Sequence, residues 1–351
     1  MRHLTTPWAV SRKSSSISRR NGMKKFVGFA LAAAFVVGTF VVVAPAESAT
    51  LRIGAHRSMW GSFEIIADRM DYWKKEGLKY KVGHFKQGKL MRNAIIQNNL
   101  DTGTTGFSPF TTAISKGAKV TAIGVTANIC AAINIIVPAK SKAKSLKDLK
   151  GSVFANKKGT STDFAFQSYV VPAYGLKSSD FPLLSVRATE RIAALISGAA
   201  KAAMVGEPQG EIAREAGYVR YLENLCKYDN TSMMHVGNPQ TIKKHPDLIY
   251  KYFRGWLKAH QLLKNDVKKY ATVYTKALNE VGDKAKVSIT LKAIKKLKTE
   301  VFITDRVKNY LNDMGDKQIK LGWIKSRPDF TKSPFIDDSI LRKAAKDIGF
   351  N

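Results

Sequence analysis

Residues 94–117 read AIIQNNLDTGTTGFSPFTTAISKG, and residues 194–217 read ALISGAAKAAMVGEPQGEIAREAG. The two segments share residues at one fixed offset, among them Ala94, Ile96, Gly106 and Gly117, which match Ala194, Ile196, Gly206 and Gly217. Each copy has an apolar helix end, a polar turn, a run of small residues, and a glycine followed by a proline that opens a new helix, where the missing proline N–H costs nothing. The repeat therefore predicts two α/β lobes built alike. Chance similarity between two ordinary strand–helix units is the alternative.

Strand patterns alternate with helical patterns on both sides of this repeat. In the first half, strands are predicted at residues 51–56, 80–85 and 120–125, with helices at 63–75 and 91–99. In the second half, strands are predicted at residues 132–137, 152–156 and 183–186, with a helix at 163–174. Residues 218–226 and 231–236 are predicted to return the chain from the second α/β lobe to the first, and from residue 239 onward the pattern is helical. Such alternation predicts an α/β fold with mixed, mostly parallel sheets, flanking helices and a C-terminal helical portion.

The N-terminus is predicted to be an export signal over residues 1–49. Basic residues precede an apolar run at residues 26–43, and Ala44-Pro45-Ala46 then supplies a small-x-small cleavage site. Met23 is an alternative start, and Ser18-Arg19-Arg20 leaves a twin-arginine signal open beside the general secretory route. The remaining alternative is a membrane anchor that is not cleaved. We therefore expect a periplasmic protein, membrane-tethered if the segment is retained.

The chain is strongly basic, with a formal net charge of +31 over 351 residues. Residues 1–49 hold seven Lys/Arg and one Glu, so the rest carries +25, from 51 basic and 26 acidic residues. This excess favours anionic small molecules, anionic membrane surfaces or nucleic acid. Since the sequence has no zinc-ligand spacing, aromatic RNA-binding pattern or basic-helix motif, we expect no nucleic-acid partner. The sequence has two cysteines, Cys130 and Cys226. In a cytosolic protein we would expect two buried thiols, whereas in an exported protein a disulfide between them is plausible, and their spacing does not distinguish these alternatives.

Several landmarks occur in order along the mature chain. They are LRIG at residues 51–54 with Trp60 after it, Gln87-Gly88, Asn99-Leu-Asp101 before Gly106-Phe-Ser-Pro109, Leu146-x-x-Leu149-x-Gly151, Gly159-Thr-Ser161, Gly198 before Glu207-Pro208, and His245-Pro-Asp-Leu248. In these features the chain resembles the solute-binding proteins of ABC importers, of the nitrate/sulfonate/taurine type. Lys201 departs from the Asp usual in that family, and the chain is more basic than expected.

The resemblance implies a two-lobed periplasmic-binding-protein type II fold that closes on a small molecule and delivers it to an ABC permease at the inner membrane. Lobe 1 would comprise residues 50–131 and 236–351, and lobe 2 residues 132–235. The hinge strands would lie near residues 130–138 and 226–238.

Turns that follow the carboxyl ends of parallel strands converge on the ligand crevice of such folds. On this basis we predict the following ligand-binding residues: Arg57, Met59, Trp60, Gln87, Gly88, Phe107, Ser108, Pro109, Thr160, Ser161, Thr162, Arg187 and Glu207.

An anionic ligand calls for backbone N–H groups at helix N-termini, hydroxyls and an arginine. Ser108 and the turn at residues 159–161 supply the first two, with plain helix capping as the alternative role. Arg57 or Arg187 would supply the guanidinium, unless both are solvated turn residues. The aromatic residues named above would stack on a ligand or shield it, or else belong to the core. Glu207 would meet a ligand amine, form a lobe-closing pair, or stabilise a helix N-terminus.

Catalytic motifs are missing from the sequence. It contains no Gly-x-Ser-x-Gly, phosphate loop or His-Glu-x-x-His motif, and no Cys-rich motif of the iron-dependent thiamine-pyrimidine synthase that shares this fold. A three-histidine metal site at His56, His84 and His235 is conceivable, but we expect no cofactor. We therefore expect a non-enzymatic receptor for a small anionic solute: a sulfonate, nitrate or an organic carboxylate. The alternative is a periplasmic metal-binding or enzymatic protein on the same scaffold.

Overall fold

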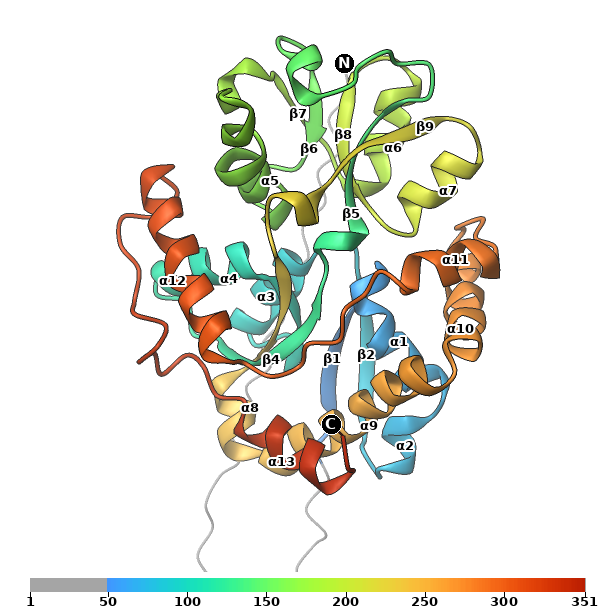
Figure 1. Cartoon of the computed structure of the whole chain (residues 1–351). Coiled ribbons are helices and arrows are strands. Elements are labelled where there is room, and N and C mark those ends of the chain that lie inside the picture. Colours follow the sequence, from blue (N-terminus) through green and yellow to red (C-terminus); the bar gives the residue numbers. More distant parts are fainter. Residues whose placement is uncertain (1–48, 351) are drawn as a thin grey trace, which may run out of the picture. The chain divides into compact units, whose positions relative to one another are not determined.

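A computed structural model describes residues 49–350 (Figure 1). The predicted export signal, its cleavage site and its alternatives fall on residues 1–48 and lie outside the described residues. Within residues 49–350, no helix combines the length and the apolar character that crossing a bilayer requires.

The first sheet is built mainly from the first third of the chain. Its five strands lie in the order β2-β1-β3-β10-β4. They are β1 (Leu51–His56), β2 (Tyr80–Phe85), β3 (Thr102–Gly106), β4 (Thr121–Asn128) and β10 (Ser232–Gly237). β1 pairs in parallel with β2 and β3, whereas β10 is antiparallel to β3 and β4. Four strands therefore run in one direction, and the returning strand β10 runs against them.

The second sheet repeats this plan with later residues. Its strands lie in the order β7-β6-β8-β5-β9. They are β5 (Ile133–Pro138), β6 (Phe154–Asn156), β7 (Leu183–Ser185), β8 (Ala202–Gly206) and β9 (Val219–Asn224). β6 is parallel to β7 and β8, and β5 is antiparallel to β8 and β9, so one strand again opposes the other four. Mixed, mostly parallel sheets are thus confirmed.

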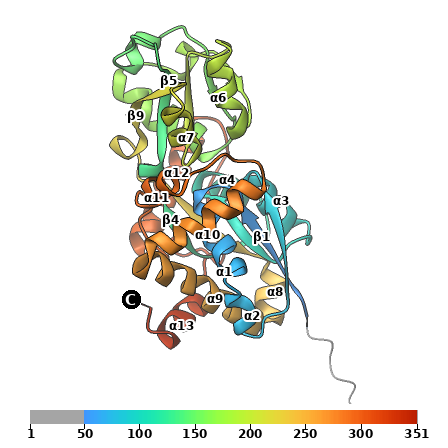
Figure 2. The ribbon, with the colours of Figure 1, turned by 90° about the vertical axis from the view of Figure 1, so that its right-hand side faces the viewer.

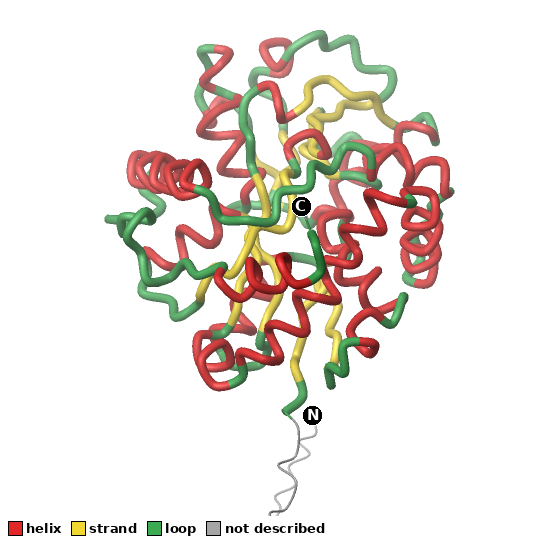
Figure 3. The backbone as a smooth tube through the Cα atoms, turned by 60° about the horizontal axis from the view of Figure 1, so that its bottom comes forward, coloured by secondary structure: helices red, strands yellow, loops and turns green. Residues whose placement is uncertain are grey.

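Helices flank the sheets (Figure 3). They are α1 (Ser62–Arg69), α2 (Tyr72–Lys75), α3 (Gly88–Ile96), α4 (Phe107–Ser115), α5 (Ser161–Ala165), α6 (Ala188–Ile196), α7 (Gln209–Glu215), α8 (Pro239–Lys244), α9 (Pro246–Asn265), α10 (Val267–Glu280), α11 (Val287–Ile294), α12 (Asp305–Lys320) and α13 (Ser339–Asp347). Aromatic residues of α1, α9 and α10 fill the core against β1, among them Phe63, Tyr252 and Trp256. Met91, Phe110 and Leu311 belong to a separate buried cluster that brings α3, α4 and α12 together. The predicted C-terminal helical portion is confirmed.

The chain crosses between the two sheets twice, from β4 to β5 and from β9 to β10. A disulfide between Cys130 and Cys226 joins these crossings, with the two Cα atoms 4.7 Å apart. Asn224 adds to the link, because its Nδ2 donates to the backbone oxygens of Ala131 at 3.0 Å and Ile133 at 3.2 Å. The disulfide that the sequence left open is therefore present, while the predicted hinge and lobe boundaries stay predictions.

The repeat extends beyond the quoted segments. α3 and α6 begin and end at matching positions, as do β3 and β8. The predicted helix at residues 63–75 is interrupted between α1 and α2, where Asp71 takes a left-handed φ of 56°. The predicted helix at 163–174 is a short α5 followed by a π turn and a 3-10 turn.

Candidate ligand-binding site

At two matching glycines of the repeat, Gly106 and Gly206, a side chain from the region of the opposite sheet packs closely against the backbone. A Cβ placed on Gly106, at the end of β3, would lie 2.0 Å from Oγ of Ser161 in α5. A Cβ placed on Gly206, at the end of β8, would lie 2.8 Å from Cη2 of Trp60, which follows β1. The absence of a side chain at both glycines therefore lets the turns of the two sheets approach closely, and the candidate site lies where they meet.

A cavity of about 120 Å³ lies between these turns, and we call it the cleft cavity. The first turns of three nine-residue helices reach its wall: Gly88 opens α3, Pro109 belongs to α4, and Ala188 opens α6. Free backbone N–H groups and the helix dipole make such ends favourable for negative charge. The strand ends Gly106 and Gly206 complete the wall.

Seven of the thirteen predicted ligand-binding residues line the cleft cavity. They are Trp60, Gln87, Gly88, Pro109, Thr160, Ser161 and Thr162. Two of their hydroxyls are engaged within the turn, because Thr160 Oγ1 donates to the Lys157 oxygen at 2.8 Å and Thr162 Oγ1 donates to Asn156 Oδ1 at 2.9 Å. The Ser161 hydroxyl, in contrast, has no partner within the described residues.

Four other predicted residues point elsewhere. Met59 is fully buried in the hydrophobic core, and Phe107 is buried in the second cluster. Ser108 is also buried, and its hydroxyl accepts from Nε2 of Gln318 in α12 at 2.8 Å. Arg187 caps α6 with an exposed side chain that lies 3.9 Å from Glu190, and it does not line the cleft cavity. Their predicted contact with a ligand gains no support from these positions.

Glu207 is fully buried and saturated by protein partners. Its Oε1 accepts from Lys296 Nζ at 2.6 Å, from Tyr221 at 2.8 Å and from Asn134 at 3.1 Å. Its Oε2 accepts from the backbone N–H of Glu211 at 2.9 Å. Lys296 follows α11, which lies next to α7 (Figure 2). The Lys296–Glu207 pair therefore joins the C-terminal helical portion to the end of the second sheet.

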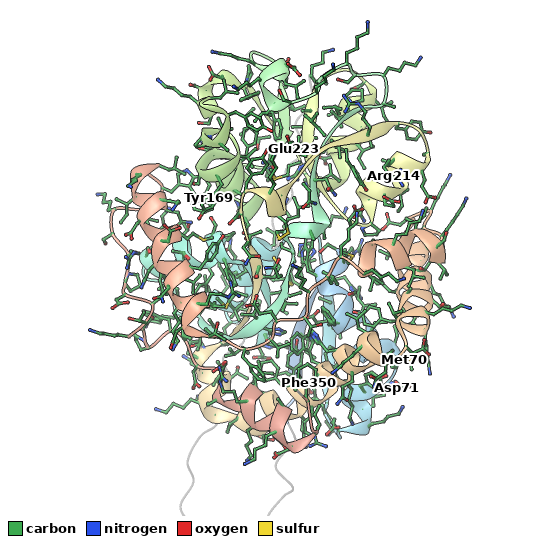
Figure 4. The ribbon with its side chains drawn as sticks, in the orientation of Figure 1. Met70, Asp71, Tyr169, Arg214, Glu223 and Phe350 are labelled. Atoms are coloured by element: carbon green, nitrogen blue, oxygen red, sulfur yellow. A yellow bond between two sulfur atoms is a disulfide. The ribbon has the colours of Figure 1, made fainter. Side chains whose placement is uncertain are left out.

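On the opposite side, α12 reaches Tyr169, which follows α5 (Figure 4). The Tyr169 hydroxyl donates to Asp313 at 3.2 Å, and the ammonium of Lys317 lies 5.2 Å from the centre of its ring. Contacts from α11 and α12 therefore hold the second sheet's lobe on two sides of the cleft cavity.

The arginine of the cleft cavity is Arg191, which sequence reasoning missed. It lies one helical turn after Arg187, lines the cavity, and is only 5% exposed. Its Nη1 donates to the Met204 oxygen at 2.6 Å, while its Nε has no partner within the described residues. Burial lowers the pKa of Arg191 to about 10, against a smaller raising effect of Asp163, so the side chain is charged at neutral pH. The repeat could have indicated this residue. At the offset of the repeat Arg191 matches Met91 of α3, which is a buried core residue, so Arg191 would have been expected to point inward as well.

The charge around the cleft cavity is one-sided. Lys86, Lys89 and Lys157 line it together with Arg191, and none of its described lining residues is Asp or Glu. His56 also lines it, and burial lowers the pKa of His56 to about 4, so this imidazole is neutral at pH 7.

Three of the described residues that line the cleft cavity carry buried donors without acceptors. Within the described residues, Trp60 Nε1, Ser161 Oγ and Arg191 Nε have no hydrogen-bond partner, although all three residues line the cleft cavity. Because buried polar atoms are nearly always hydrogen-bonded, such a set calls for an acceptor in the cavity.

Arg57 lines a neighbouring cavity of about 170 Å³ and not the cleft cavity. A wider groove of about 780 Å³ lies by the ends of α9 and α11, away from the repeated turns. The three histidines named for a metal are separated: His235 is buried against Tyr252, and His84 is exposed on β2. Within residues 49–350 no three His, Cys, Asp or Glu side chains gather as metal ligands would.

Comparisons with known proteins identify the family of the chain. The family model described as NMT1/THI5 like matches residues 62–268, which include strands of both sheets. The chain belongs to the NMT1/THI5-like family. It is 28% identical over 216 residues to an Escherichia coli (strain K12) protein described as binding aliphatic sulfonates, covering 61% of this chain and 67% of that protein.

Solved structures share the fold of this NMT1/THI5-like protein, among them two binding proteins. The alkanesulfonate-binding protein of Xanthomonas axonopodis pv. citri bound to MOPS has a TM-score of 0.73 at 19% identity, covering 83% of this chain and 99% of that chain. The periplasmic nitrate-binding protein of Synechocystis PCC 6803 has a TM-score of 0.71 at 13% identity, covering 87% and 90%. The periplasmic-binding-protein fold and the family predicted from the sequence are confirmed.

Proposed function

We propose that this protein is an exported receptor that captures a small oxyanion and presents it to an ABC permease at the inner membrane. A sulfonate is the first candidate, and nitrate and an organic carboxylate are the others. The protein performs no chemistry on the solute, which is released unchanged.

The observation that carries this proposal is the buried set of donors at the cleft cavity. Three donors lack acceptors, and one of them belongs to a guanidinium with no carboxylate hydrogen bond. A sulfonate offers three acceptor oxygens and one negative charge, and it has no donor of its own. It would therefore complete every one of these hydrogen bonds and neutralise Arg191, whereas a cation or a neutral donor would complete none.

Capture would follow from the approach of the two lobes. Lobe 1, comprising residues 50–131 and 236–351, would bring Trp60 and the start of α3, and lobe 2, residues 132–235, would bring Ser161 and Arg191. Closure would exclude water from the cleft cavity, so the attraction between the oxyanion, the guanidinium and the helix ends would act at a low effective dielectric constant.

The relatives support the same class of solute. The Escherichia coli relative is described as binding aliphatic sulfonates, and the proteins of like fold are described as binding alkanesulfonates or nitrate. A metal-binding or enzymatic role on this scaffold is the other possibility raised by the sequence, and the experiment below separates it.

The test compares two arginines of one helix. In Arg191→Met the cleft position receives the residue type that α3 carries at Met91, so the fold should tolerate it. We expect this variant to bind methanesulfonate, nitrate or benzoate about 30- to 150-fold more weakly, because a hydrogen bond to a charged group contributes about 2–3 kcal/mol. Arg187→Met, one turn earlier and exposed, should bind within about 2-fold of wild type.

Binding is measured by isothermal titration calorimetry in Tris-HCl, with and without EDTA, and the solute is recovered and identified afterwards. No binding of any of the three anions to the wild-type protein would refute the proposal. Loss of binding after EDTA treatment, or conversion of the solute, would favour the metal-binding or enzymatic alternative. Equal effects of the two substitutions would remove Arg191 from the site.

A further inference from the structure

Two cavities meet at Trp60. The first is the cleft cavity of about 120 Å³. The second, which we call the side cavity, has about 170 Å³. The residues that line the side cavity but not the cleft cavity are Arg57, Ser58, Val205, Gln209, Val281 and Asp283. Five residues line both: His56, Trp60, Lys86, Ala188 and Gly206. Besides Ala188 and Gly206, the shared wall contains the side chains of Trp60, His56 and Lys86, of which the Trp60 indole is the largest.

The indole is fixed at both ends. Its six-membered ring rests on Gly206, where a Cβ would lie 2.8 Å from Cη2 and 3.1 Å from Cζ3. Its backbone belongs to the 3-10 turn Met59–Gly61, and this turn is tight because a Cβ on Gly61 would lie 2.0 Å from the His56 oxygen. The His56 ring stands 5.6 Å from the indole at an angle of 52°. The indole thus reaches from the end of β1 to the end of β8 and spans the space between the cavities.

The two cavities differ in chemistry. The cleft cavity holds the unpartnered hydroxyl of Ser161 and the guanidinium of Arg191, which suit the oxyanion head. The side cavity has Val205 and Val281 in its wall, with Arg57 and Asp283 beside them, so it offers apolar room for a chain and carries charges of both signs.

Resting on the proposed oxyanion capture, we infer that Trp60 is the partition that sets the length of the solute. With the indole in place, the group attached to the oxyanion is confined to the cleft cavity, so the protein selects short-chain sulfonates. Without the indole, the two cavities join, and the space beside the head more than doubles. A longer alkyl chain then enters the side cavity and is removed from water.

The test is a chain-length series of methane-, ethane-, butane- and hexanesulfonate, titrated into wild type, Trp60→Phe, Trp60→Leu and Trp60→Ala. In wild type, affinity should fall once the chain exceeds two or three carbons. In Trp60→Ala, methanesulfonate should bind more weakly than in wild type, because the Trp60 donor and its shielding are lost. Affinity should then rise with length by about 4-fold for each methylene that becomes buried.

Trp60→Phe keeps an aromatic wall but loses the indole N–H, so it should bind every sulfonate more weakly than wild type while keeping the wild-type dependence of affinity on chain length. Trp60→Leu should lie between Phe and Ala, and it decides the question if circular dichroism shows that the Ala variant does not fold. An unchanged length profile in the Leu and Ala variants would overturn the inference. Failure of the wild-type protein to bind any member of the series would instead refute the proposed function.

Discussion

Gly106→Ala is the change that most directly tests whether the two sets of turns close on each other. Gly106 has φ −70° and ψ 155°, which alanine adopts without strain, so any effect must come from the added methyl group. That Cβ would lie 2.0 Å from Ser161 Oγ, 3.1 Å from Ser161 Cβ and 3.3 Å from Pro109 Cδ. Rotating the hydroxyl relieves only the first contact, so α5 and the end of β3 must also separate by a few tenths of an ångström.

We expect Gly106→Ala to weaken methanesulfonate binding about 5- to 150-fold, because overpacking of a well-fitted contact costs about 1–3 kcal/mol. The cost should appear in binding, measured by calorimetry, more than in the thermal midpoint, since the contact joins the two lobes and not the core of either. Gly103→Ala is the control on the same strand, where the added Cβ meets its nearest atoms at 3.4 Å, an ordinary contact.

Ser161→Gly provides the second half of a double-mutant cycle. It removes both Ser161 atoms that the new methyl group would meet, at the cost of one donor to the solute. Adding Gly106→Ala to Ser161→Gly should therefore have little further effect. If Gly106→Ala weakens binding equally in both backgrounds, or leaves wild-type affinity unchanged, the close approach at this glycine is not part of the bound state.

Two further predictions concern stability. Cys130→Ser with Cys226→Ser should lower the free energy of unfolding by about 2–5 kcal/mol, because the disulfide closes a loop across a separation of 96 residues; urea denaturation that coincides with wild type would contradict this. Burial raises the pKa of Glu64 to about 8, so the stability held by its neutral form is complete below pH 4.5 and is lost as the pH rises toward 8. The free energy of unfolding of Glu64→Gln should therefore rise relative to that of wild type by about 1.4 kcal/mol per pH unit across that window. If urea denaturation gives the same difference between the two proteins at pH 5 and at pH 8, the prediction is wrong.

The sequence predicted the fold well because its signals were local. The strands predicted at residues 51–56 and 80–85 coincide with β1 and β2, where alternating and apolar residues are bounded by turns. Helix interruptions were missed, since the left-handed φ of Asp71 has no marker in an otherwise helical pattern. Seven of the residues that line the cleft cavity were predicted, because strand ends and helix starts are visible in the sequence.

Side-chain direction was the part that local patterns could not predict. Some residues in the first turn of a helix point toward the cavity and others toward the core, which is why Pro109 lines the cleft cavity while Ser108 faces α12. Arg187 had the expected place at a helix start, yet its side chain is exposed. Helical side chains lean toward the N-terminus, so Arg191, one turn later, is the residue that reaches the cavity.

The repeat also indicates why a single buried arginine would be enough to bind one monoanion. At matching positions the two lobes carry Met91 and Arg191, both buried. A methionine there contributes to the core, whereas a guanidinium there is a cost unless something in the cavity compensates it. Had both lobes carried arginine, the two charges would repel each other as the lobes approached, and a single oxyanion would leave one of them unpaired. Among the described cations that line the cleft cavity, only Arg191 is buried, since Lys86 is exposed and Lys89 and Lys157 are half-buried. One buried positive charge is matched by one negative charge, which is the reason to expect one small monoanion per protein and to look for it between Trp60 and Ser161.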